Sequence, residues 1–172
     1  MELLSVALIS VILLALFLPA FSEIYGANTA IANAPTAQAN ASDMATTIAT
    51  ALADAPVVGG ICITAATATG VSFYSSPAGA VTKYSVAAGT FSVTENGKTT
   101  VLYTGATLGI TYFKSATYNS SALAPFVPAT PATLAQVVAV RINSSETLNG
   151  YSSSYSECVR LRNGPARPVS FS

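Results

Sequence analysis

Leu3 to Phe21 read LLSVALISVILLALFLPAF, the apolar run that decides the fold of this 172-residue chain. Only Ser5 and Ser10 interrupt it, and a serine hydroxyl can bond back to a carbonyl of its own helix. The run is close to the roughly 20 residues that cross a bilayer as a helix. A secretory signal would carry positive charge before the apolar run, and this chain begins Met-Glu. The run therefore predicts a membrane helix or a helix buried in an assembly.

Two residues are unusual in such a segment. Glu2 places an acid directly before the run, and burying a carboxylate is costly unless it is paired. Either Glu2 has a cationic partner, or it stays solvated among lipid headgroups; its position alone leaves both interpretations open. Pro19 removes one backbone hydrogen bond near Ala15 and clashes with the preceding turn, so we expect a kink there.

Glu2-Leu3-Leu4, followed by the apolar run that ends in Leu18-Pro19-Ala20-Phe21, resembles the N-terminal segment of bacterial type IV pilins and pseudopilins. The resemblance covers about the first 25 residues, in which the acid, the apolar helix and the spacing to the proline agree together. It implies that Glu2 pairs with the N-terminal amine of a neighbouring subunit and that Glu2 and Pro19 serve assembly. Family members are cleaved after a glycine and carry the glutamate slightly further along, so we expect this sequence to begin about three residues inside the mature chain.

The same resemblance implies a function and its partners. The chain would be a structural subunit of an extracellular type IV pilus, a homo-oligomeric helical filament, held in the inner membrane before the pilus assembly machinery extracts it. Adhesion, twitching motility and DNA uptake are roles that the resemblance allows. One alternative is a pseudopilin or minor pilin of a type II secretion or DNA-uptake system. Another is a membrane-anchored binding domain or enzyme, which would need neither Glu2 nor Pro19.

Helical spacing continues beyond the apolar run. Gly26 and Pro35 weaken the middle of this region, so we expect a helix that is bent or interrupted near Pro35. A further helical stretch from Met44 carries Ile48 and Leu52 on one face and ends before Pro56. The resemblance implies that this lower half packs on a sheet. We therefore assign residues 1–54 to an N-terminal helix.

Residues 57–172 change to strand-like patterns and are assigned to a β-rich globular head. Asn96-Gly97 between two such runs is a strong hairpin signal. We expect residues 122–131 to be an irregular crossover, residues 144–156 to be polar and exposed, and residues 158–162 to be either a last strand or a surface loop. The remaining predicted strands are 57–65, 71–74, 81–86, 90–95, 99–103, 107–114 and 137–142. A helix followed by an antiparallel sheet is an α+β fold, and its order here is pilin-like.

The composition argues against several functions. The chain has no His, 8% charged residues against roughly 25% in a typical soluble domain, and zero formal net charge. The acids are scattered, so we expect no catalytic residues, no cofactor and no metal, and we do not expect an enzyme. Arg160, Arg162 and Arg167 are the only basic cluster. They are either a DNA-binding or anionic-surface site or a solvated tail, and three charges supply little phosphate affinity.

The chain has two cysteines, Cys62 and Cys158, without the close spacing of a metal site. If the chain is exported, an oxidising compartment favours a Cys62–Cys158 disulfide. Closing a loop of that length would stabilise the fold by about 4–5 kcal/mol in the chain-entropy treatment. The alternative is a pair of buried free thiols.

Overall fold

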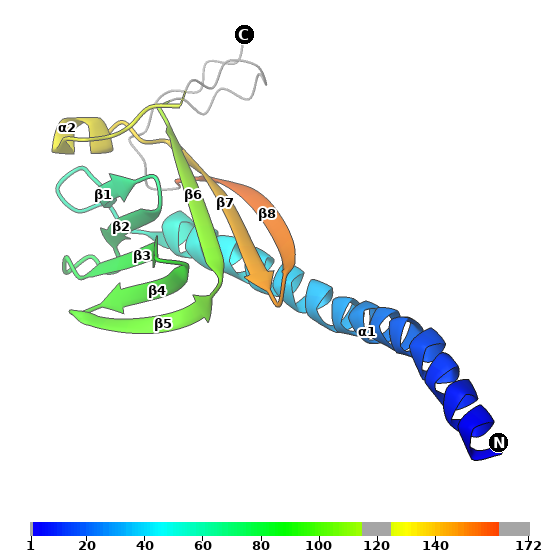
Figure 1. The fold of residues 1–172 in the computed structure, drawn as a ribbon. Helices are drawn as coiled ribbons and strands as arrows, with labels where there is room; N and C mark the ends of the chain where they lie inside the picture. Colours follow the sequence, from blue (N-terminus) through cyan, green and yellow to red (C-terminus); the bar gives the residue numbers. More distant parts are fainter. Residues whose placement is uncertain (1, 115–124, 162–172) are drawn as a thin grey trace, which may run out of the picture.

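A computed structural model describes residues 2–114 and 125–161, with side chains from residue 10 onward. One long helix, α1 (Glu2–Asp54), leads into a head made of two antiparallel sheets (Figure 1). The C-terminal half of α1 packs on the head, while its N-terminal half projects away from it (Figure 1). This arrangement confirms the expected α+β fold, and it is consistent with a pilin-like architecture.

α1 passes through both of its prolines without a break. The interruption that we allowed for near Pro35 does not occur, and Figure 1 shows α1 as continuous but curved. One proline removes a single backbone bond, and the flanking alanines have high helix propensity. From Ala37 onward, packing against the head also holds the helix in place. Near the first proline, Ser22 donates its hydroxyl to the Pro19 carbonyl at 2.8 Å.

The first sheet is a five-stranded meander in which each strand pairs with its neighbours in sequence. Its hairpin at Asn96-Gly97 has φ angles of 51° and 76°, the left-handed conformation that a two-residue turn of this type requires. The predicted hairpin is therefore confirmed, although the first strand starts later than we expected. The strands are β1 (Ile63–Thr67), β2 (Gly70–Tyr74), β3 (Val81–Ala87), β4 (Thr90–Glu95) and β5 (Lys98–Thr104).

The second sheet has the order β6-β7-β8 and lies beside the first (Figure 1). Its strands are β6 (Ala106–Phe113), β7 (Ala139–Leu148) and β8 (Tyr151–Arg160). The chain between β6 and β7 includes a single helical turn, α2 (Pro131–Leu134), which Thr130 caps.

Most of residues 144–156 are exposed or partly exposed, as expected, but the segment is strand rather than irregular chain. They complete β7 and most of β8, joined by a turn at Asn149-Gly150 with φ angles of 50° and 86°. Ser144 and Glu146 are buried, at 2% and 3% exposed. The exceptions face α1, where Ser144 donates its hydroxyl to the Ala41 carbonyl. Of the two alternatives for residues 158–162, the last strand is correct for residues 158–160, which end β8, while residue 162 lies outside the described residues.

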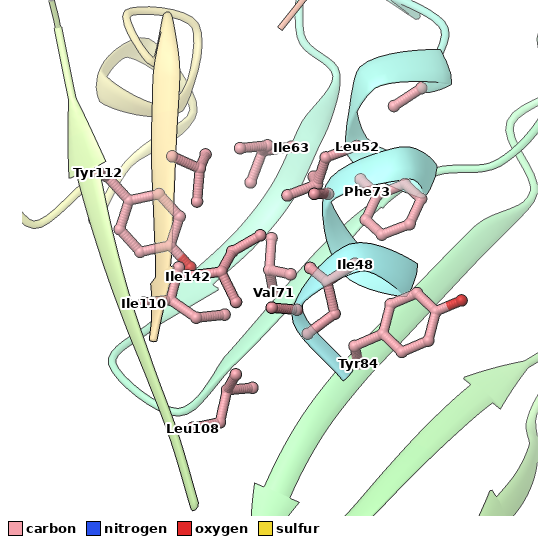
Figure 2. Packing of buried hydrophobic residues seen from close by; sticks show 14 of the residues in the cluster. Ile48, Leu52, Ile63, Val71, Phe73, Tyr84, Leu108, Ile110, Tyr112 and Ile142 are labelled. Atoms are coloured by element: carbon pink, nitrogen blue, oxygen red, sulfur yellow. The ribbon is translucent and has the colours of Figure 1, made fainter. Parts of the chain in front are cut away.

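The core lies between α1 and the two sheets. Ile48 and Leu52 of α1 face Val71 and Phe73 of β2, and Ile142 of β7 joins them from the second sheet (Figure 2). Aromatic rings stack across neighbouring strands of the first sheet, with centroids about 6 Å apart; the stack runs Phe73, Tyr84, Phe91, Tyr103. The predicted packing of Ile48 and Leu52 is confirmed.

Candidate functional site: an exposed apolar arm

The most unusual surface of the molecule is the N-terminal half of α1. We call residues 10–25 the arm. Its large apolar side chains are between 48% and 75% exposed. They are Val11, Ile12, Leu13, Leu14, Leu16, Phe17, Leu18, Phe21, Ile24 and Tyr25.

The arm is apolar on every side from Val11 to Phe21. Val11 to Leu14 are four consecutive apolar residues, and four positions already cover a full helical turn. A surface helix of a water-soluble protein has a polar face, and this arm has none before Ser22. Exposed apolar surface of this extent marks contact with lipid or with another protein. Within the described chain, one helix is long and apolar enough to cross a membrane, and it is the helix that carries the arm.

The two predicted assembly residues occupy different places. Pro19 lies inside the arm, in unbroken helix. Glu2 is the first helical residue of α1. Its side chain is not among those that the structure describes, so the predicted role of its carboxylate is not tested. The structure thus puts both residues on one helix ahead of the head, and the pairing of Glu2 stays a prediction.

The β7–β8 hairpin marks the end of the arm. Tyr151 donates its hydroxyl to the Gly26 carbonyl at 3.2 Å, and Asn149 donates its side-chain amide to Asn33 at 3.5 Å. Further along α1, Ser144 donates its hydroxyl to the Ala41 carbonyl. These contacts between the β7–β8 hairpin and α1 were not predicted from the sequence, although Asn149-Gly150 between two extended runs was a signal for the hairpin.

The two cysteines do not form the expected disulfide in the structure, where both thiols are free. Cys62 is buried just before β1, and this burial raises the pKa of its thiol. Cys158 is exposed on β8, opposite Arg141 of β7. Because side chains alternate along a strand, Cys158 shares the outer face of the sheet with Arg141, while Val140 and Ile142 face the core. A bridge would require β8 to turn its other face inward.

The other candidate sites remain dispersed. Among the side chains that the structure describes, no three His, Cys, Asp or Glu groups gather to hold a metal. Arg160 is exposed at the end of β8, and Arg162 and Arg167 lie outside the described residues. The arm is therefore the feature that distinguishes this chain from an ordinary small globular domain.

Comparison of the chain with protein-family models, with curated proteins and with solved structures finds no match.

Proposed function

We propose that this chain is a structural subunit of an extracellular filament of the type IV pilin kind. The arm would anchor the subunit in the inner membrane before assembly and would pack against arms of other copies in the filament core afterwards. The head would form the filament surface. Adhesion, motility or DNA uptake would then be properties of the assembled fibre.

One observation carries this proposal: a helix that is exposed and apolar on all sides from Val11 to Phe21 and continues into a half that fits the head. Burying a large apolar side chain gains about 1.5–3 kcal/mol. The arm has ten such side chains exposed, so its burial gains tens of kcal/mol in total. Lipid already supplies most of this gain, and moving the subunit from the membrane into a filament therefore needs the work of an assembly machine.

Glu2 gives the proposal its specificity. A carboxylate at the start of an apolar helix is costly in a filament core unless a cation pairs with it, and losing one partner of a buried pair is strongly unfavourable. We therefore expect Glu2→Ala to insert into membranes normally and to yield few or no filaments. Glu23→Ala, on the same helix beyond Pro19, is the matched control and should assemble.

The first experiment is negative-stain electron microscopy of material sheared from producing cells, with mass spectrometry of any filaments. Long filaments composed mainly of this chain support a major pilin. If the chain is confined to the membrane fraction, the proposal of a major pilin fails and two alternatives remain. A pseudopilin or minor pilin would still lose its activity in the Glu2→Ala variant.

A membrane-anchored binding domain or enzyme is the second candidate, because the arm is long and apolar enough for an ordinary anchor. Replacing residues 1–21 with an unrelated membrane-spanning helix separates these functions. An anchored domain would keep its activity after the exchange, whereas a filament subunit would not assemble.

A further inference from the structure

α1 and both sheets meet at one junction in the head. Tyr103 of β5 donates its hydroxyl to an Asp43 carboxylate oxygen of α1. Three residues after Tyr103, Ala106 of β6 is the register partner of Glu146 in β7. The chain crosses between the sheets at Gly105, with φ of 73°, and a Cβ atom there would lie 2.4 Å from the Thr147 carbonyl oxygen. The junction is therefore tightly closed on the side of the strand crossing.

Glu146 is the unusual residue at this junction, because it is a buried acid with an oxygen that is unpaired within the described part of the chain. It is only 3% exposed, and its Oε2 atom is buried without a hydrogen-bond partner among the described residues. A buried polar atom without a partner is costly, and more so when it carries charge. In native proteins such atoms are few, and an ion or a water that is bound there is a common explanation.

Glu146 lies on the face of β7 that packs against α1 near Asp43, because Ser144, two residues earlier on that face, donates its hydroxyl to the Ala41 carbonyl, two residues before Asp43. The pKa of Tyr103 is raised to about 12, mainly by its hydrogen bond to Asp43 and then by burial; the negative charges of Asp43 and Glu146 add to the rise. The three groups differ in depth, with Asp43 exposed, Tyr103 half-buried and Glu146 buried. Two carboxylates and a phenol from three elements thus lie in one region between α1 and the two sheets, and the Asp43 side is open to solvent.

We propose that this junction binds a Ca²⁺ ion through the carboxylates of Asp43 and Glu146 and the hydroxyl oxygen of Tyr103. Ca²⁺ prefers oxygen ligands, accepts irregular geometry and keeps water in its remaining positions. The ion would enter from the Asp43 side and give Glu146 Oε2 the partner that it lacks. Bound there, it would tie α1 to β5 of the first sheet and to β7 of the second. This inference does not depend on the proposed filament function.

The test uses the full chain in detergent, stripped with EDTA, and Ca²⁺ as the probe. We expect calorimetric titration to show one Ca²⁺ per chain, and millimolar Ca²⁺ to raise the melting temperature by several degrees. Tb³⁺, which replaces Ca²⁺ at oxygen sites, should show emission sensitised by tyrosine, because the chain has no Trp. Tyr103→Phe should weaken that emission.

Variants assign the binding to the junction. Glu146→Gln should abolish Ca²⁺ uptake, and Asp43→Asn, at an exposed position of α1, should weaken it at least tenfold. Glu157→Gln is the matched control: this acid lies on β8, where Thr46 donates a hydrogen bond to it at 3.2 Å, and uptake should be unchanged. No Ca²⁺ uptake by the unmodified chain would overturn the proposal, as would uptake that survives both Asp43→Asn and Glu146→Gln.

Discussion

The two halves of α1 are one continuous helix with opposite relations to the rest of the molecule. Residues 10–25 are exposed, and residues 11–21 among them are apolar on all sides. Residues 37–54 are apolar on one face, and that face is buried at Ala37, Ala41, Met44, Ala45, Ile48, Ala49 and Leu52. The spacing of three and four residues in the second half matches one turn of helix.

This difference indicates what each half of α1 contacts. The buried half places Ala41 beside Ser144 of β7, which donates its hydroxyl to the Ala41 carbonyl, and its larger residues Met44, Ile48 and Leu52 join the apolar core. Its surface therefore fits one specific partner, the head. The arm has large side chains in every direction, which suits a medium or an assembly that surrounds the helix.

Deleting residues 1–24 is the strongest test of this comparison, and we expect the largest effect from it. The variant keeps Gly26 and every described contact of α1 with the head, so the head should remain folded. It should lose membrane association and filament formation completely. Cell fractionation and near-ultraviolet circular dichroism measure the two results. A head that unfolds on this deletion would show that the arm contributes to folding and would break the distinction between the halves.

Matched leucine-to-alanine changes compare the halves directly. Leu52 is 1% exposed, and replacing a buried leucine with alanine costs about 2–5 kcal/mol through lost burial and the cavity left behind. Leu14 is 66% exposed, so Leu14→Ala should leave the unfolding free energy of the head unchanged. Urea unfolding of both variants in detergent, followed by tyrosine circular dichroism, measures the difference. Equal losses of unfolding free energy in the two variants would contradict the distinction between the two halves of α1.

The sequence predicted the helix, its buried face and most strands of the first sheet because the periodicity and turn residues were explicit. Asn96-Gly97 lies between apolar-rich runs, so its hairpin was evident. Asn149-Gly150 lies between serine-rich runs, and its hairpin was missed. These serine-rich strands pack against α1, where Ser144 donates its hydroxyl to the Ala41 carbonyl, a tertiary contact that no local pattern contains.

The candidate sites, like the fold, could be predicted from the sequence only in part. The apolar composition of the arm and the positions of Glu2 and Pro19 are visible in the chain itself. The buried position of Glu146 is not, because its neighbours Asp43 and Tyr103 are distant in sequence. The free state of Cys158 also depends on the register of β8, which decides the face that its side chain occupies.

Alkaline pH should weaken the contact between the head and the buried half of α1. The pKa of Tyr103 rises from its usual 10 to about 12, mainly because the phenol donates a hydrogen bond to Asp43. A raised pKa means that the folded state holds this proton more tightly, so its stabilising contribution is full below pH 10 and disappears as pH rises through 12. A fully buried group would lose roughly 1.4 kcal/mol of unfolding free energy per pH unit between pH 10 and 12. Tyr103 is partly exposed, so solvent screening makes its loss smaller than this.

Tyr103→Phe isolates this effect. The variant should be less stable than the unmodified chain at pH 8, and the two urea midpoints should converge as pH approaches 12. Tyr112 also has a raised pKa, owing to its burial, but it is present in both chains and cancels from the difference. A difference that stays constant between pH 8 and 12 would contradict the role of the Tyr103–Asp43 bond.

The smallest expected effect lies at the boundary between the two halves. Tyr151→Phe removes the hydroxyl that reaches the Gly26 carbonyl at 3.2 Å. This exposed hydrogen bond contributes at most about 0.5–1.5 kcal/mol, because water competes for both partners and Thr29 also donates to the same carbonyl. We expect little change in the unfolding of the head, but faster hydrogen exchange of α1 amides near residue 26. Asn149→Ala, at the same hairpin, should extend the faster exchange toward Asn33. Unchanged exchange in both variants would mean that the buried half ends further along α1, at the packing of Ala37 and Ala41, and that the hairpin does not set the boundary.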